Sequence, residues 1–178
     1  MTDLFDADVP VHYGYINVLA DEDDQADLMD TRAGQLNGLV GAAVPGQLSL
    51  VTGLHTGDVP LVVRWHDAEP AVGADWEDVV EVSFEPPGPD LLVAAFEDSF
   101  ALRLPVVRSL RARLSASGMD AGHDADTTPD DGTSPDRYLL ELWPAAPAAD
   151  AVVRQTSDIA AYWHREARKS AGPNAAKG

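Results

Sequence analysis

The residues best suited to chemistry are concentrated in one acidic stretch in the second half of the chain. Its members are carboxylates and one imidazole at short spacing: Asp120, His123, Asp124, Asp126, Asp130 and Asp131. Carboxylate oxygens suit Ca²⁺ or Mg²⁺, but the stretch lacks the glycine and the terminal glutamate of an EF-hand loop. We therefore expect a solvated acidic segment and no metal or other cofactor.

The remaining polar residues form no recognisable catalytic motif. The five histidines are isolated, with neither an H-x-H nor an H-E-x-x-H pattern: His12, His55, His66, His123 and His164. No serine lies in a G-x-S-x-G elbow, and no phosphate-binding P-loop occurs. Glu81 and Glu85 would lie about 13 Å apart along a strand, too far for a glycosidase pair. We assign no catalytic residue and favour a protein that is not an enzyme.

Charged residues also occur inside the stretches that read as strands. Glu81 and Glu141 could meet only if their strands were neighbours, and we expect both on solvated sheet faces. The arginines at outward-looking strand positions are Arg64, Arg103, Arg111 and Arg113. We expect them to pair with nearby carboxylates; the alternative is a small patch that binds an anionic ligand or a partner.

The charge of the chain is strongly negative and unevenly distributed. Thirty acidic residues oppose twelve basic ones, which gives a net charge of −18 and disfavours direct binding of nucleic acid. Half of the acidic residues lie in 1–30 and 115–136, which contain no Lys or Arg. Dense negative charge steers association with a basic partner. We predict partner contacts in these segments at Asp21, Glu22, Asp23, Asp24, Asp124, Asp126, Asp130 and Asp131.

The elements that must position these residues are mostly short strands. The expected strands are 11–19, 48–54, 59–66, 78–85, 91–96, 99–104, 107–114 and 137–143, with 48–54 and 59–66 as a pair. The prolines at 86, 87 and 89 interrupt any continuous strand. This spacing predicts a mainly β fold, an antiparallel β-sandwich or a barrel-like domain.

Helices are expected at the periphery of this fold. A short helix is predicted near 28–44, and a C-terminal helix begins after Thr156 or Ser157 and runs to about 169. The segment 115–136 has almost no bulky apolar residue, so we expect a flexible acidic loop. The whole reads as a single β-rich domain over 1–169, with a disordered tail over 170–178.

Composition also bears on the compartment. The chain has no cysteine, which excludes disulfides, a thiolate nucleophile and zinc sites that use cysteine. No run approaches the roughly 20 apolar residues that span a bilayer, and no secretory leader is evident at Met1-Thr2-Asp3. We expect a cytoplasmic protein that does not bind membranes.

Two short motifs carry a resemblance to a known family. V-H-Y-G-Y at 11–15 opens a strand, and D-x-Y-x-L-x-L-W at 136–143 forms the last one. In strand order and in these aromatic positions, residues 10–143 resemble the competence-associated DNA nuclease inhibitors, the Nin/ComJ-like family. The acidic segment and the C-terminal helix depart from that family. The resemblance implies a β-sandwich that binds and blocks a DNA nuclease, and it fixes no inhibitory residue.

Two functional interpretations follow from these observations. The first is a non-enzymatic acidic binding protein, an inhibitor or immunity-like partner of a basic protein such as a DNA nuclease or a toxin. The alternative is a small-ligand-binding protein or an enzyme, with a pocket between the sheets lined by Tyr13, Tyr15, Trp65 and the strand arginines. A pocket with convergent polar groups would favour the alternative, and a flat acidic face would favour the inhibitor.

Overall fold

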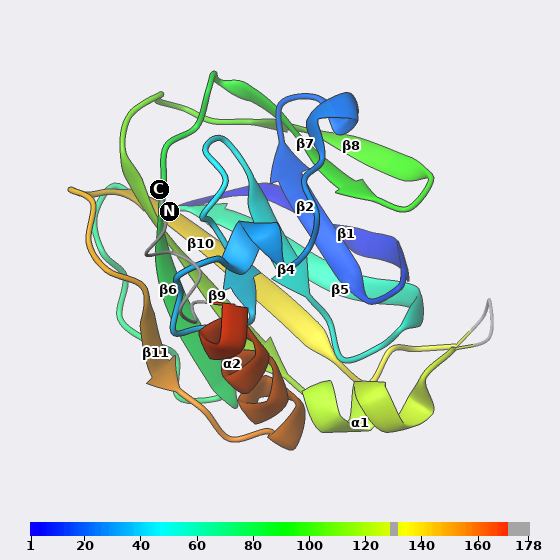
Figure 1. Cartoon of the computed structure of the whole chain (residues 1–178). Coiled ribbons are helices and arrows are strands. Elements are labelled where there is room, and N and C mark those ends of the chain that lie inside the picture. Colours follow the sequence, from blue (N-terminus) through cyan, green and yellow to red (C-terminus); the bar gives the residue numbers. More distant parts are fainter. Residues whose placement is uncertain (129–131, 171–178) are drawn as a thin grey trace.

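Two β-sheets pack face to face in the computed structural model, which describes residues 1–128 and 132–170 (Figure 1). The six-stranded sheet has the order β1 (Thr2–His12), β5 (Thr56–Trp65), β10 (Arg137–Pro144), β9 (Leu110–Ser117), β6 (Asp78–Phe84) and β11 (Ala151–Arg154). The five-stranded sheet has the order β3 (Val40–Gly41), β4 (Leu48–Val51), β2 (Tyr15–Leu19), β7 (Asp90–Ala95) and β8 (Asp98–Arg103). The mainly β class and the sandwich are therefore confirmed; the sheets do not close into a barrel.

The core between the sheets follows from the alternation of side chains along the strands. Successive residues of a strand point to opposite faces, so every second residue of β5 and β10 is apolar and faces inward. Leu61 and Leu140 of the larger sheet share one hydrophobic cluster with Ile16, Leu50 and Val93 of the smaller one, and all five are fully buried. β10 runs parallel to β5, whereas every other pairing within the described sheets is antiparallel.

Three strand predictions are corrected by the structure. The strand expected over 11–19 is two strands, because Tyr13 and Gly14 adopt positive φ and turn the chain from one sheet to the other. β1 begins as early as Thr2, and the sequence does not indicate this first part of the strand because it contains Asp3, Asp6 and Asp8. These three residues are exposed on the edge strand of the larger sheet. The strands expected over 48–54 and 59–66 do not pair, since β4 and β5 belong to different sheets.

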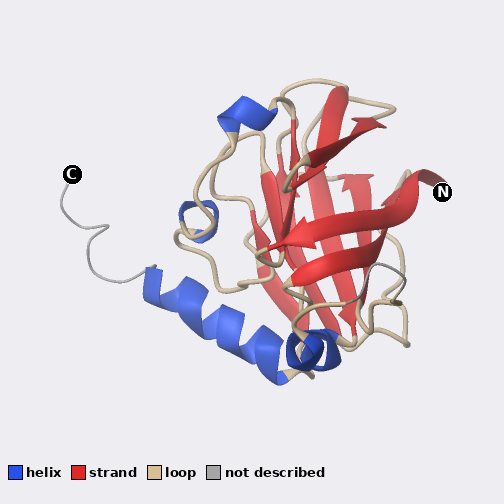
Figure 2. Ribbon diagram, turned by 90° about the vertical axis from the view of Figure 1, so that its right-hand side faces the viewer, coloured by secondary structure: helices blue, strands red, loops and turns tan. Residues whose placement is uncertain are grey.

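Helical segments flank the sandwich as two 3₁₀ turns, η1 (Glu22–Asp24) and η2 (Asp30–Arg32), and two α-helices, α1 (Met119–Ala125) and α2 (Asp158–Ser170). Figure 2 shows α1 and α2 together at one end of the sandwich. The C-terminal helix is confirmed, and the Ser157 hydroxyl caps it by accepting from the Ala160 N–H at 3.1 Å. No helix among the described residues is long and apolar enough to cross a membrane.

The helix expected near 28–44 is limited to the single turn η2. Gly38 lies so close to the carbonyl of Trp163 in α2 that a Cβ at this position would collide with it. The irregular chain around it is held by Arg32, which is fully buried and donates to the carbonyl oxygens of Leu28, Gly38 and Ser49. Burial lowers the pKa of Arg32 to about 9, so the guanidinium still carries its charge at neutral pH.

The segment 115–136 is not one flexible loop over its described part. β9 continues to Ser117, and α1 follows directly, because Met119 supplies a large apolar side chain that is fully buried. Asp136 at the far end is also fully buried. Asp130 and Asp131 lie outside the described residues. The tail predicted over 170–178 is corrected at its first residue, because Ser170 is the last residue of α2, and 171–178 lie outside the described residues.

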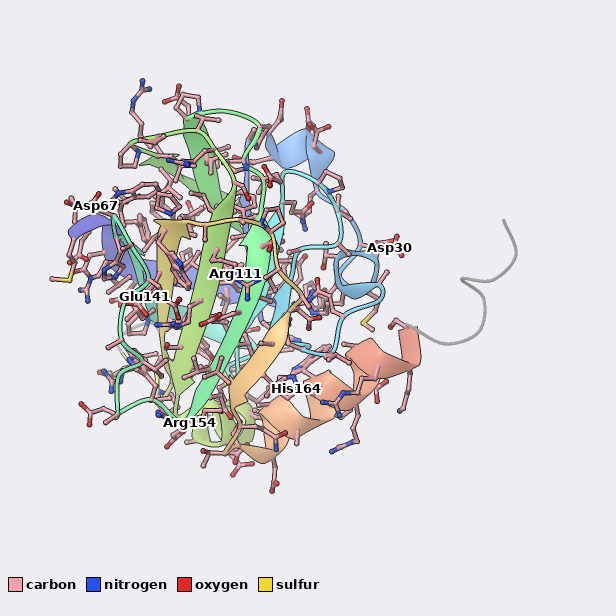
Figure 3. The ribbon with its side chains drawn as sticks, turned by 90° about the vertical axis from the view of Figure 1, so that its left-hand side faces the viewer. Asp30, Asp67, Arg111, Glu141, Arg154 and His164 are labelled. Atoms are coloured by element: carbon pink, nitrogen blue, oxygen red, sulfur yellow. The ribbon has the colours of Figure 1, made fainter. Side chains whose placement is uncertain are left out.

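The outer face of the six-stranded sheet carries a row of alternating charges. Asp3, Arg64, Glu141, Arg113 and Glu81 occupy paired positions on five neighbouring strands, from β1 to β6. Figure 3 shows Arg111 and Glu141 on this side of the molecule. Opposite charges at paired positions stabilise each other, so the row helps to fix the strand register.

The middle of this row is buried, which corrects the expectation that Glu81 and Glu141 lie on solvated faces. The expected pairing of the four strand arginines with nearby carboxylates is confirmed. Arg113 is 1% exposed; its guanidinium donates to Glu81 Oε1 at 2.8 Å and to the Pro70 carbonyl at 2.7 Å. It also stacks on the ring of Trp143, with 4.9 Å between its Cζ and the ring centroid. Arg111 donates to the carbonyls of residues 148 and 149. Segments near 70 and 148 thus cover this face, whereas Arg64 and Arg103 pair with Asp3 and Asp90 nearer the surface.

The contact between α2 and the 33–44 segment predicts a sensitivity to acid. His164 is 1% exposed, and its Nδ1 accepts from the Gly38 N–H at 2.9 Å, so Nε2 carries the proton. Burial, together with a smaller effect of Arg168, lowers its pKa to about 4 against the opposing effects of Asp78 and Asp150. Because the histidine of an unfolded chain titrates near pH 6.5, the unfolded state binds more protons between pH 6.5 and 4.

We therefore expect the free energy of unfolding to fall by about 2 kcal/mol through His164 alone as the pH is lowered from 6.5 to 4. Urea denaturation at several pH values measures this loss. In His164→Asn the amide oxygen can accept from Gly38 and cannot be protonated in this range, so its pH dependence should be flatter by that amount. Identical pH dependence in both proteins would contradict the role given to His164.

Candidate binding site at one end of the sandwich

Two turns at one end of the sandwich present bulky aromatic residues to solvent. Tyr13, between β1 and β2, has φ 65° and is 63% exposed; Phe96, between β7 and β8, has φ 48° and is 61% exposed. Among the described residues, Asp126 is the only other non-glycine residue with positive φ. Aromatic residues rarely adopt this conformation, which costs about 1 to 3 kcal/mol. Because Tyr13 and Phe96 are strained and yet exposed, burial does not explain their conformation, and we infer a functional role for them.

Two histidines connect these aromatic side chains into one cluster. The ring of His12 lies between those of Tyr13 and Phe96, at centroid distances of 4.2 and 4.5 Å, and His55 lies 5.4 Å from Tyr13. The Thr56 hydroxyl is 3.1 Å from His12 Nδ1 and 2.8 Å from His55 Nδ1. Since a hydroxyl donates one hydrogen but can accept two, at least one of the two imidazoles must carry a proton on Nδ1 for both hydrogen bonds to form. We call His12, Tyr13, His55 and Phe96 the aromatic cluster.

A pocket of about 320 Å³ lies beside the aromatic cluster, between the β1–β2 turn, the 52–55 segment, α1 and α2. Its lining includes Tyr13, Gly53, His55, His123, Asp126, Ile159, Tyr162 and Trp163. An adjoining hollow of about 440 Å³ shares His123, Ile159 and Tyr162 and adds Asp120, Asp124 and Asp158. The two together are large enough for a side chain or a small ligand.

A buried carboxylate fixes the floor of this pocket. Asp136 Oδ2 accepts from the N–H groups of Gly53 and Leu54, both at 2.9 Å, and from the Tyr138 hydroxyl at 2.6 Å. Burial and the neighbouring Asp136 raise the pKa of Tyr138 well above its usual value, so the hydroxyl keeps its proton. The two helices beside the pocket are also joined, because Asp120 of α1 accepts from the N–H groups of Asp158 and Ile159 at the start of α2. The pocket is therefore held in place from several elements.

The pocket and the hollow are negatively charged. Asp120, Asp124, Asp126 and Asp158 line them, and none of the four makes an ion pair with another described residue. No group of three or more His, Asp or Glu side chains in 1–128 and 132–170 is arranged to hold a metal ion. The arrangement suits a cationic or aromatic group rather than an anion.

The structure brings together only part of the predicted site. Asp124 and Asp126 lie at this end, on and after α1. The residues from Asp21 to Asp24 lie in and beside η1, at the opposite end of the molecule (Figures 1 and 2). Asp130 and Asp131 are outside the described residues. Among the described residues, Asp21 to Asp24 therefore do not share a face with Asp124 and Asp126.

The pocket that the sequence placed between the sheets is not assembled in that form. Trp65 belongs to the core and is 5% exposed, and Arg111 and Arg113 lie on the outer face of the larger sheet. Tyr15 lines a separate hollow of about 190 Å³. Only Tyr13 reaches the main pocket, and sequence reasoning missed Phe96 and its contact with His12. The sequence signal that could have indicated Phe96 is an aromatic residue at a turn position where glycine is usual.

This architecture is similar to that of solved structures, although no family model and no curated protein matches the sequence. Among solved structures, ComJ of Bacillus subtilis, described as an inhibitor of the DNA degrading activity of NucA, superimposes with a TM-score of 0.55. It is 13% identical, and the match covers 81% of this chain and 98% of that chain. The structure titled crocagin biosynthetic gene J gives a TM-score of 0.50 at 14% identity, over 82% of this chain and 100% of that one. The resemblance inferred from the sequence is thus confirmed for the fold, and the chain has the architecture of ComJ.

Proposed function

We propose that this protein is a non-enzymatic binding protein that inhibits a nuclease by occupying its surface. The observation that carries the proposal is the pair of strained, exposed aromatic residues, Tyr13 and Phe96. Aromatic side chains are enriched among the residues that dominate binding energy at protein interfaces, because they bury a large area with little loss of side-chain freedom. The fold shared with ComJ supports an inhibitor role.

The charge of the chain supports a basic partner. A nuclease must attract a polyanion, so its cleft is electropositive, and a protein of net charge −18 approaches such a cleft faster than a neutral one. Asp126 lines the pocket together with Tyr13 and His55, and Asp124 lines the adjoining hollow, where both would contact the partner. Asp21 to Asp24 lie at the other end, where they would act only through the long-range field. Exposed charges act over about 8 to 10 Å at physiological ionic strength.

The proposal is tested with purified protein and the basic DNA nuclease encoded nearest to its gene. Increasing amounts of the protein are added to the nuclease before plasmid DNA, and degradation is followed on gels. We expect inhibition to be complete near one equivalent and association to slow as the salt concentration rises. Undiminished degradation at a large excess, together with no complex by size-exclusion chromatography, would overturn the proposal for this nuclease.

A further inference from the structure

We propose that the pocket between Tyr13, α1 and α2 is a receptor for one arginine side chain of the partner protein. This inference rests on the proposed binding function and adds how the partner is held. The lining of the pocket and the adjoining hollow combines aromatic faces with carboxylates that form no ion pair within the described part of the chain.

The aromatic walls provide the surfaces on which a guanidinium can stack. Tyr13 and Tyr162 are both exposed, and Trp163 lines the same pocket, 5.3 Å from the Tyr162 ring centroid. A guanidinium is planar and weakly hydrated, and it is attracted to the electron-rich face of an aromatic ring within about 6 Å. The ammonium group of lysine is compact and more strongly hydrated, so lysine should bind less well.

The carboxylates provide the charge that the occupant must neutralise. Asp126 borders the pocket, and Asp124 borders the adjoining hollow on the same helix end. Neither forms an ion pair within 1–128 and 132–170. A guanidinium can donate to a carboxylate and stack on a ring at once, whereas an anionic ligand would meet only repulsion.

The protein itself uses this combination elsewhere. The guanidinium of Arg113 lies over Trp143 while donating to Glu81, and that of Arg137 lies over Trp76 with 4.5 Å between Cζ and ring centroid. The pocket offers the same aromatic and acidic groups with no arginine of the described chain among its lining. We therefore assign to the partner the arginine side chain that would complete this arrangement in the pocket.

The inference is tested with a small probe and without the partner. N-acetyl-arginine methylamide is titrated into the ¹⁵N-labelled protein, and the indole N–H signal of Trp163, assigned through Trp163→Phe, is followed by NMR. The citrulline analogue, which is similar in shape but neutral, and the lysine analogue serve as comparisons. We expect saturable shifts with the arginine probe at about 1 to 10 mM, as for a single weakly held group. The shifts should be smaller with lysine and absent with citrulline.

Two variants with equal loss of charge sharpen the test. Asp124→Asn with Asp126→Asn should weaken arginine binding about fivefold or more, whereas Asp23→Asn with Asp24→Asn, at the opposite end, should leave it unchanged. Equal binding of citrulline, or equal weakening by both pairs of substitutions, would overturn the arginine assignment. Inhibition of a nuclease without probe binding would remove this inference alone. Probe binding with no inhibition would instead count against the proposed function.

Discussion

Replacing both Tyr13 and Phe96 by glycine is expected to weaken binding of the nuclease by about 100-fold or more while leaving the fold at least as stable. Both residues have positive φ, which glycine adopts without strain, and both rings are more than half exposed. Removing them deletes two binding side chains and relieves the backbone at the same positions. Affinity is measured by calorimetry, and stability by urea denaturation.

A matched control separates this effect from a general loss of apolar surface. Val106 and Val107 are each 46% exposed in the connection between β8 and β9. Their double replacement by alanine should leave affinity within a factor of about two, as for residues outside an interface. If the glycine variant binds as tightly as the native chain, the aromatic cluster is not the contact surface. Marked destabilisation of that variant would show that the two rings serve the fold instead.

Replacing Arg113 by methionine is expected to lower the free energy of unfolding by about 3 to 5 kcal/mol. Arg113 lies between Glu81 and Glu141 on paired strands, and its guanidinium is 1% exposed. Methionine retains part of the packing against Trp143, but it leaves two largely buried carboxylates facing each other with less compensation. Urea denaturation of the variant at neutral pH measures the loss.

Two further variants show whether charge is the cause. Adding Glu141→Gln to Arg113→Met removes the carboxylate whose remaining described ion-pair partner is only the His66 imidazole, and should restore part of the lost stability; Glu81 keeps its pair with Arg111. Arg103→Met breaks an exposed pair with Asp90 and should cost less than about 1 kcal/mol. A loss below about 1 kcal/mol for Arg113→Met would mean that water reaches the row of charges on this face.

Most elements of the fold could be predicted because they depend on local patterns. The alternation along 78–85 and the helical pattern after Ser157 indicate a strand and a helix without any knowledge of the rest of the chain, and both are present. β1 escaped detection because its outward positions are aspartates, which are rare in strands. α1 escaped because its stabilisation comes from burial of Met119 and from hydrogen bonds between Asp120 and the first N–H groups of the distant helix α2.

The site depends on pairings that sequence alone cannot supply. From the sequence, Glu81 and Glu141 can meet only if their strands are neighbours, and in the structure β9, with Arg113, lies between those two strands. The sequence predicts Tyr13 at a pocket, but its neighbours in the observed pocket include His123 of α1 and Tyr162 of α2, more than 100 residues further along the chain. Phe96 meets His12 only because β7 and β1 end at the same place. Such long-range contacts are set by topology, which propensities do not encode.

The acidic edge strand β1 affects how copies of this chain behave toward one another. An unpaired edge of a long strand is a template for the strand of another molecule, and proteins protect such edges with charges and proline. Asp6 and Asp8 are exposed along this edge, and Pro10 interrupts its hydrogen-bonding pattern. Two such edges brought together would place like charges side by side. We therefore expect Asp6 and Asp8 to oppose self-aggregation of the protein. This role does not depend on which partner the protein binds.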